Sequence, residues 1–168
     1  MDEIFDVVDA QDRVIDRLPR AEVHRRGLRH RAVHIFVFNR AGQVFLQKRS
    51  RSKDSNPGHW DSSVSGHVDS GEDYDAAAKR ECFEELGIEA PPLERLFYVE
   101  AQPVTGEEFC WVYRAYSEGP FVLHPDEIEE GRWVDPGLVE SAVAPLSPCF
   151  HFLWKRFREK ENGRGDRI

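Results

Sequence analysis

The sequence of 168 residues predicts a single domain of the α+β or α/β class. Three observations lead to this expectation. The length suits one domain with one hydrophobic core. Short segments rich in β-branched and aromatic residues, bounded by turn residues, predict several strands. Two further segments have the residue spacing and the end signals of helices. We expect the domain to span residues 1–161 and residues 162–168 to form a flexible tail.

The first 73 residues are predicted to contain strands, one short helix and a long loop. The predicted elements are a strand at 4–8, a turn at 9–12, a helix at 18–27, strands at 31–38 and 44–49, a loop at 50–58 and an extended segment at 60–68. The helix has Pro19 near its beginning and Gly27 at its end, the usual places for these residue types. The turn sequence Asn39–Gly42 separates two apolar runs, which predicts that they form a hairpin.

The rest of the chain contains the clearest helix of the sequence, at residues 74–86, with Gly87 as its left-handed cap. Strands are predicted near 93–101, 109–116 and 131–134. A last helix, near 147–160, has an apolar stripe at helical spacing, formed by Phe150, Leu153, Trp154 and Phe157. Mixed strands with a few helices favour a sandwich of sheet and helices.

Composition favours a folded intracellular protein. Apolar residues make up 40% of the chain and charged residues 32%, a balance too hydrophobic for a disordered chain. No apolar run approaches the roughly 20 residues that span a bilayer, and the acidic amino terminus lacks the pattern of a secretory signal. The three cysteines, Cys82, Cys110 and Cys149, are odd in number and lie in apolar contexts. We therefore expect reduced, mostly buried thiols, no membrane association and a cytoplasmic location.

Charged residues are unevenly distributed along the chain. The net charge of −8 argues against a nucleic-acid polymer as a partner. Residues 13–53 nevertheless hold 12 of the 23 basic residues and two acidic ones, a local balance of +10, whereas residues 69–89 hold eight acidic and two basic residues, a balance of −6. A basic segment beside an acidic one suits a ligand that brings phosphates together with divalent cations. Two solvated faces of opposite charge are the alternative.

Three glutamates share one face of the predicted helix at residues 74–86. Glu81, Glu84 and Glu85 are spaced at i, i+3 and i+4, and they lie in the last turns, where the helix dipole disfavours negative charge. Each unfavourable interaction costs roughly a few tenths of a kcal/mol. A divalent cation such as Mg²⁺ or Mn²⁺ would reverse both costs, because it binds hard oxygen ligands and leaves room for substrate phosphates. A solvated acidic face is the alternative.

The region around this helix resembles the Nudix box, a pattern of seven fixed residue types at fixed spacing. The fixed positions are occupied by Gly66, Glu72, Arg80, Glu81, Glu84, Glu85 and Gly87, and Ile88 follows in an aliphatic position. A random match at one start point has a chance on the order of one in 10⁸, given an abundance of roughly 5–7% for each residue type. Cys82 departs from the pattern by standing in an aliphatic position, where a buried cysteine behaves as a small hydrophobic residue.

The resemblance to the Nudix hydrolases implies a fold, a reaction and a set of roles. The implied fold is an α/β/α sandwich with a mixed sheet, in which the box forms a loop, a helix and a second loop. The implied reaction is metal-assisted hydrolysis of a diphosphate linkage. The implied metal ligands are Glu81, Glu84, Glu85 and the carbonyl group of Gly66, and the implied catalytic residues are Glu81, Arg80 and Glu84. Arg80 would orient the carboxylates, and Glu72 would brace the loop.

The base that activates water is not fixed by the box. By analogy with the family Glu81 is the first candidate, but a glutamate of a later loop often takes this role in other members. The later carboxylates available in this sequence are Glu107, Glu108, Glu127 and Glu130. The sequence does not choose among them.

Upstream of the box, the resemblance narrows to the branch that is similar to isopentenyl-diphosphate isomerases. The residues that carry it are His30-Arg31-Ala32, Phe36-Val37-Phe38-Asn39, Gly42, Leu46–Arg49, Ser52-Lys53, Pro57-Gly58, Trp60 and Gly66-His67. The isomerases have a cysteine where this sequence has Ser65, and they bind a metal through positions that match His24, His30, His67 and Glu108, while another acidic position falls on Gly106. A hydroxyl group is a far weaker acid than a thiol. Because the box here is also complete, a hydrolase is favoured over an isomerase.

Substrate binding is expected to use basic residues between positions 25 and 53. The candidates are Arg25, Arg26, Arg29, Arg31, Lys48, Arg49, Arg51 and Lys53. Among these, Lys48 and Arg49 end a strand that leads toward the box, and with Arg31 they are the residues we expect to contact phosphates. The expected partner is a small diphosphate or nucleotide. The alternatives to a hydrolase are an isomerase of isoprenoid diphosphates and a sensor that binds a nucleotide without cleaving it.

Overall fold

The computed structural model describes residues 2–165 of the chain. The strands are β1 (Ile4–Val8), β2 (Val14–Pro19), β3 (His30–Phe38), β4 (Val44–Arg49), β5 (Trp60–Asp61), β6 (Val64–His67), β7 (Glu94–Val99), β8 (Glu108–Tyr116) and β9 (Ile128–Val134). The helices are α1 (Arg20–Arg26), α2 (Tyr74–Leu86), α3 (Val139–Ala142) and α4 (Pro148–Gly165), with short 3-10 turns at Pro103–Thr105 and Pro136–Leu138.

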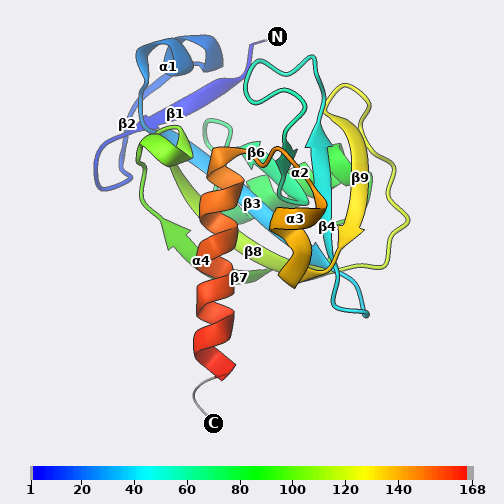
Figure 1. Ribbon diagram of the computed structural model, residues 1–168. Coiled ribbons are helices and arrows are strands. Elements are labelled where there is room, and N and C mark those ends of the chain that lie inside the picture. The colour runs from blue at the N-terminus through cyan, green and yellow to red at the C-terminus, as the bar shows by residue number, and fades with distance from the viewer. Residues whose placement is uncertain (1, 166–168) are drawn as a thin grey trace.

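A mixed sheet forms the middle layer of the molecule (Figure 1). Within the described residues it has seven strands, in the order β5-β4-β3-β8-β7, with β6 paired to β3 and β9 paired to β4. β3 and β8 run parallel at the centre, and the other pairs are antiparallel. The α/β/α fold implied by the resemblance is confirmed.

The two faces of the sheet carry separate hydrophobic cores because side chains alternate along β3. Ala32 and Phe36 pack on one face with Phe150 and Trp154 of α4. On the other face, Val33 and its alternating neighbours pack with the buried side of α2. The sheet thus holds α2 and α4 at fixed positions on opposite sides.

The central strands β3 and β4 are joined by the predicted turn but separate immediately. They pair only at Phe38 and Val44. Farther from the turn, β3 pairs with β6 and β4 pairs with β5, while β9 pairs with the whole length of β4. The hairpin prediction is therefore right at the turn and wrong for the rest of the two strands. Their separation leaves a space between them that the functional side chains line.

Residues 2–27 form a small unit above this space (Figure 1). β1 and β2 pair as an antiparallel ribbon, and Phe5, Val7 and Val23 of α1 bury their side chains together. The predicted helix at 18–27 is shorter than expected, because residues 14–19 form β2. This strand shows no alternation of apolar and polar side chains, since most of it is exposed.

The helix at 74–86 has the predicted bounds. The side chain of Asp73 accepts a hydrogen bond from the amide of Ala76 at its beginning, and Gly87 ends it in the left-handed conformation with φ of +67°. The last helix begins one residue later than predicted and continues to Gly165, so residues 162–165 are helical rather than part of a tail. The rest of the predicted tail, residues 166–168, lies outside the described residues.

The cysteines agree with the expectation from composition. All three cysteines are free thiols, with Cys82 and Cys110 buried and Cys149 half-buried. Across residues 2–165, every helix is too short or too polar to cross a membrane.

Candidate active site

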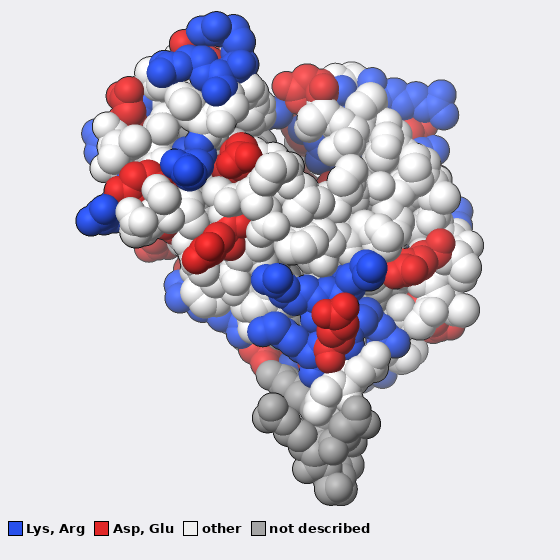
Figure 2. All heavy atoms as spheres, turned by 60° about the vertical axis from the view of Figure 1, so that its left-hand side comes forward, with Lys and Arg blue, Asp and Glu red and all other residues white. Residues whose placement is uncertain are grey.

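A cavity of about 640 Å³ opens where β3 and β4 separate. Its wall includes α1, the beginning of β8, the loop at 53–56, the end of β6, the glutamate face of α2 and the first residues of α4. Figure 2 shows the surface hollowed at the top of the view, between two projecting parts that both carry lysine and arginine side chains. The cavity therefore joins elements from both ends of the chain.

The carboxylate of Glu81 lies against the backbone of β6 at Gly66. A Cβ atom at position 66 would lie 2.2 Å from Cδ of Glu81, so the close approach requires glycine. Burial raises the pKa of Glu81 to about 7, although Arg80 acts in the opposite direction. A cation beside this carboxylate would stabilise its charged form.

Glu85 is the most buried of the three box glutamates on α2. Its carboxylate accepts hydrogen bonds from Nε2 of Gln47 (3.0 and 3.2 Å) and from the amide of Ser65 (3.1 and 3.3 Å). Burial, together with the charge of Glu81, raises the pKa of Glu85 well above its usual value. Glu84 is exposed, and all three glutamates line the same cavity. The predicted metal ligands are thus brought together with Gly66.

Arg80 connects the parts of the box. Its guanidinium donates two hydrogen bonds to Glu72 (2.8 and 2.9 Å), one to the carbonyl of His67 (2.9 Å), and one each to Glu81 (2.7 Å) and Glu84 (3.1 Å). Arg80 is not among the residues that line the cavity. The geometry matches the predicted role in orienting carboxylates, and Glu72 in turn accepts from the amide of Asp69 and so braces the loop.

Of the three residues predicted to bind phosphate, only Arg49 lines the cavity. Its guanidinium donates to the carbonyl and hydroxyl oxygens of Ser55 (3.0 and 3.2 Å) and lies 3.7 Å from Asp61. These contacts hold the head group of Arg49 at the rim of the cavity.

Lys48 and Arg31, also predicted to contact phosphates, lie outside the cavity wall, because neighbouring residues of a strand point to opposite faces. Lys48 lies away from the cavity, with Nζ 3.8 Å from Glu129. Arg31 donates to the side chain and carbonyl oxygens of Asp12 (2.7 and 2.6 Å) and is outside the cavity wall. Lys48 thus pairs with strand β9, and Arg31 pairs with the turn at Asp12.

Two other basic residues line the cavity. Lys53, which was among the wider set of candidates, makes an ion pair with Glu127. Arg20, which sequence reasoning missed, makes ion pairs with Glu3 (3.3 Å) and Asp54 (3.1 Å). Only the position of α1 above the cavity brings Arg20 to the site, and no local pattern signals it.

Two of the four later carboxylates lie in the cavity wall, Glu108 and Glu127, while Glu107 and Glu130 do not. Burial raises the pKa of Glu108. The pKa of Glu127 is lowered: burial would raise it, but the hydrogen bond and the charge of Lys53 outweigh that effect. The candidates for a base outside the box are therefore reduced to two.

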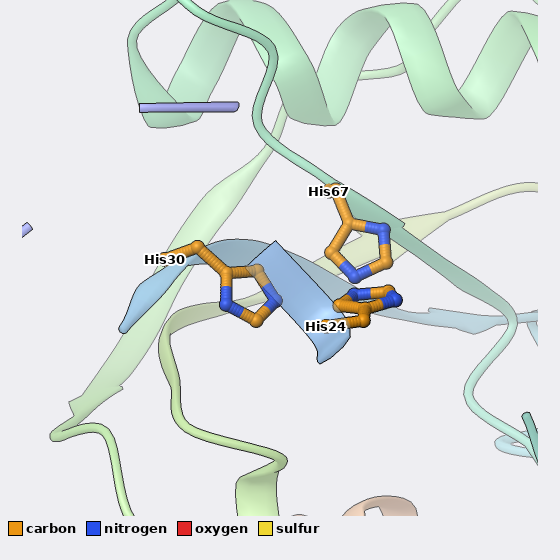
Figure 3. Close-up of side chains that lie close together, drawn as sticks. All are labelled: His24, His30 and His67. Atoms are coloured by element: carbon orange, nitrogen blue, oxygen red, sulfur yellow. The ribbon is translucent and has the colours of Figure 1, made fainter. Parts of the chain in front are cut away.

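A second group of possible metal ligands stands at the α1 side of the cavity. His24 of α1, His30 of β3 and His67 of β6 point their rings toward one another (Figure 3), and their ligand nitrogens all lie within 4.8 Å. Oε2 of Glu108 lies 3.2 Å from His67 and 3.7 Å from His30. Phe5 of β1 packs against all three rings.

Two of these histidines are held in the neutral form. Burial lowers the pKa of His30 to about 4 and that of His67 to about 3, so both rings are neutral at pH 7. Nε2 of His30 is buried without a hydrogen-bond partner. Neutral imidazoles and one carboxylate form a set that divalent transition metals accept. The histidines singled out in the sequence are thus brought together.

Comparison with known proteins identifies the family. The NUDIX domain matches residues 28–150. An uncharacterized Nudix hydrolase of Yersinia pestis is 39% identical over 152 residues, which cover 87% of this chain and 80% of that protein. An isopentenyl-diphosphate Delta-isomerase 2 of Photorhabdus laumondii is 34% identical over 167 residues, which cover 97% of this chain and 93% of the isomerase.

A solved structure agrees with these relatives. The crystal structure of DR0079 from Deinococcus radiodurans has a TM-score of 0.79 and 31% sequence identity, with 92% of this chain and 98% of that chain covered. The predicted branch is also confirmed, because relatives of both kinds, hydrolases and isomerases, match most of this chain. The glutamate-lined cavity therefore belongs to an enzyme of the Nudix hydrolase family.

Proposed function

We propose that this enzyme hydrolyses a phosphoanhydride bond of a nucleoside di- or triphosphate, or of a related nucleoside diphosphate derivative, with Mg²⁺ or Mn²⁺ as its metal. One observation carries the proposal: the carboxylates of Glu81, Glu84 and Glu85 converge on one cavity beside the backbone of Gly66. Arg20, Arg49 and Lys53 line the same cavity, and there they would bind the phosphates of a substrate.

The box residues fit a divalent metal. Glu85 is buried and Glu81 is half-buried beside it, and both carboxyl groups have raised pKa values. A cation would neutralise the charge that burial disfavours, and glycine at position 66 lets the carboxylate of Glu81 approach the backbone of β6. Glu81, Glu84, Glu85 and the carbonyl of Gly66 are the residues that would hold it. When bound, such a metal supplies charge neutralisation at the phosphates and lowers the pKa of a coordinated water.

The remaining roles fall to side chains of the chain itself. Arg80 keeps the glutamates in position through its hydrogen bonds, with Glu72 as its partner. Arg49 and Lys53 would bind phosphate oxygens. Glu81, Glu108 and Glu127 are the candidates for the base that accepts a proton from water.

The test is a metal-dependent assay on a panel of substrates, with the products resolved by phosphorus NMR. The panel contains nucleoside di- and triphosphates, nucleotide sugars, dinucleoside polyphosphates and isopentenyl diphosphate. It includes ADP ribose, because the NUDIX domain of Shewanella oneidensis NrtR, which shares the fold at 18% identity and a TM-score of 0.64, was crystallised with that compound. Release of a monophosphate from one class of substrate, only with Mg²⁺ or Mn²⁺, is the expected result.

A matched pair of variants tests the metal assignment. Glu84→Gln removes one proposed ligand from an exposed position and should reduce turnover by about 10²-fold or more without a loss of stability. Glu89→Gln changes an exposed glutamate outside the cavity and should leave turnover unchanged. Equal turnover of both variants and the unmodified chain would remove Glu84 from the metal site.

A second candidate function is isomerisation of an isoprenoid diphosphate. The grouping of His24, His30 and His67 beside Glu108 favours it, as it would supply a second metal site. The hydroxyl group of Ser65 argues against it. Rearrangement of isopentenyl diphosphate without nucleotide hydrolysis would establish the isomerase, whereas binding of a nucleotide with no turnover of any substrate would indicate a sensor. A cytoplasmic location remains a prediction, consistent with three free thiols.

A further inference from the structure

A separate group of metal-ligating side chains lies deeper in the cavity, on the α4 side of the sheet. His34 of β3 and Cys110 of β8 are buried, and Cys149 is the second residue of α4. Their ligand atoms all lie within 4.8 Å of one another. None of the three belongs to the Nudix box or to the group of His24, His30 and His67.

The ring of His34 is oriented by its neighbours. Nδ1 is hydrogen-bonded to Oγ of Ser62 at 2.8 Å and lies 3.8 Å from the carboxylate of Asp61. Nε2 consequently faces the sulfur of Cys149 at 3.7 Å. A histidine whose second nitrogen is held by a hydroxyl or carboxylate group is the usual arrangement around a metal-bound imidazole.

The spacing matches one edge of a tetrahedral site. Zinc bonds of about 2.3 Å to sulfur and about 2.0–2.1 Å to nitrogen place these two atoms about 3.6 Å apart at the tetrahedral angle. The observed separation of 3.7 Å between Nε2 of His34 and Sγ of Cys149 agrees with that value. A set of two sulfurs and one imidazole binds zinc in preference to calcium or magnesium.

We propose that His34, Cys110 and Cys149 bind a thiophilic divalent cation such as Zn²⁺, and that its fourth coordination position opens into the cavity. His34 and Cys149 both line the cavity wall, whereas Cys110 lies behind them. This site differs from the glutamate site in chemistry, because thiolates select soft cations and carboxylates select hard ones. It is independent of which substrate the glutamates process.

The protonation of the thiols supports this arrangement. A hydrogen bond from Cys110 and the proximity of His34 lower the pKa of Cys149 to about 7 despite its burial. Cys149 also lies in the first turn of an 18-residue helix, where the dipole favours a thiolate. Cys110 has a raised pKa, because it donates to Cys149 and is buried. Burial would lower the pKa of His34, but the charge and the hydrogen bond of Cys149 raise it to about 9. A cation would therefore displace protons from His34 and Cys110.

The two metal sites are linked through a single pair of residues. His34 lies opposite Ser65 in the ladder between β3 and β6, and the amide of Ser65 donates to the carboxylate of Glu85. A cation at His34 would thus stand one cross-strand pair from the glutamates, on the wall of the same cavity. A bound substrate could meet both cations.

The experiment uses the full chain, stripped of metal by a chelator under reducing conditions, with Co²⁺ alone as the probe. Cobalt bound to thiolates gives an intense sulfur-to-cobalt charge-transfer band that carboxylate and imidazole ligands do not produce. We expect this band to appear, to saturate as Co²⁺ is added and to be abolished by Zn²⁺. The band therefore reports this site even if cobalt also binds at Glu81 or at His67.

Variants assign the ligands. Cys149→Ser and Cys110→Ser should each lose most of the band and weaken Zn²⁺ binding by at least about a hundredfold. Cys82→Ala, which removes the third cysteine, and His24→Ala, which breaks the other histidine group, should keep the band. Ser62→Ala should weaken Zn²⁺ binding by about 10- to 100-fold, because it releases the ring of His34.

A measurement on the unmodified chain covers the case in which a variant fails to fold. Zn²⁺ should slow alkylation of Cys149 by iodoacetamide, and the chelator should restore the rate. Absence of the band, a band that is unchanged in Cys149→Ser, or an alkylation rate that is insensitive to Zn²⁺ would overturn the proposal. So would a disulfide between Cys110 and Cys149 that forms in the presence of one equivalent of Zn²⁺ under air.

Discussion

The glutamate wall and the histidine wall of the cavity are buried to a similar degree but respond to burial in opposite ways. The glutamate wall is formed by Glu81 and Glu85, whose pKa values are raised, and the histidine wall by His30 and His67, whose pKa values are lowered. In both cases burial favours the neutral form of the side chain. A bound cation would stabilise the charged form of the glutamates, which burial disfavours. The histidines would bind a cation in the neutral, unprotonated form that burial already favours.

The comparison predicts a large difference in turnover between variants of the two walls. Glu81→Gln should reduce the rate of hydrolysis by about 10³-fold or more, equivalent to about 4 kcal/mol, because it removes both a metal ligand and a candidate base. His67→Asn should change the same rate by less than about tenfold. Steady-state kinetics on the substrate found by the panel measure both. The reverse order would place the catalytic centre at the histidine wall.

Opposite pH dependences of stability are expected for the two walls in metal-free protein. Glu81 has a folded-state pKa of about 7, above its ordinary value of 4.5. As pH rises between these two values, Glu81 lowers the free energy of unfolding, by up to about 3 kcal/mol. His30 and His67, with folded-state values of about 4 and about 3, cost stability as pH falls below their ordinary value of 6.5.

Urea unfolding in chelator, from pH 4 to pH 8, separates these contributions. Relative to the unmodified chain, Glu81→Gln should gain stability as pH rises, and His67→Asn should gain stability as pH falls. Added Mn²⁺ should shrink both differences. Two variants with parallel pH profiles would show that the walls do not differ in this way.

A smaller effect is expected for Gly66, which lies against Glu81 of the glutamate wall and precedes His67 of the histidine wall. Gly66→Ala puts a Cβ atom 2.2 Å from Cδ of Glu81, so the carboxylate or the strand must move. We expect a loss of about 2 kcal/mol in the free energy of unfolding and a marked loss of turnover. Denaturant unfolding and the hydrolysis assay measure these. Gly137→Ala, at a position without a positive φ where the nearest atom to an added Cβ is Nη2 of Arg158 at 4.0 Å, provides the control for a general effect of replacing glycine.

The smallest effect is expected for Asp73→Ala, and it should change metal binding only at the glutamate wall. Asp73→Ala removes the side chain that caps α2, at a cost of about 1 kcal/mol and about 2–4 °C in Tm for a chain of this size. Because α2 carries the glutamates and not the histidines, metal binding at the box should weaken while cobalt binding at Cys149 should not. A calorimetric scan and metal titrations check this, and equal weakening at both sites would contradict it.

The sequence predicts the glutamate wall in detail because its signals are local. The spacing of Glu81, Glu84 and Glu85 and the cap at Gly87 fix one helix face and its end within a few turns of chain. The histidine wall was visible as three separate residues, and only the meeting of α1, β3 and β6 makes it a group. The cluster at His34 was invisible for the same reason, since it joins β3, β8 and α4.

The basic residues that face the cavity were harder to predict, because a shift of one position along a strand reverses the direction of a side chain. Arg49 faces the cavity, while Lys48 and Arg31 lie on the opposite side of their strands. Strand β2 was missed because its exposed side chains lack a period of two. The sequence identifies the strands that approach the site, and only the register of each strand shows which side chains enter it.

The unit formed by residues 2–27 has a consequence for how this enzyme is divided in experiments. Glu3, Arg20 and His24 line the cavity, yet they precede residue 28, where the match to the family begins. A fragment cut at that boundary would keep the box and lose one side of the chamber around the substrate. Exchange of this unit between relatives should therefore transfer the preference for a substrate without altering the bond that is cleaved.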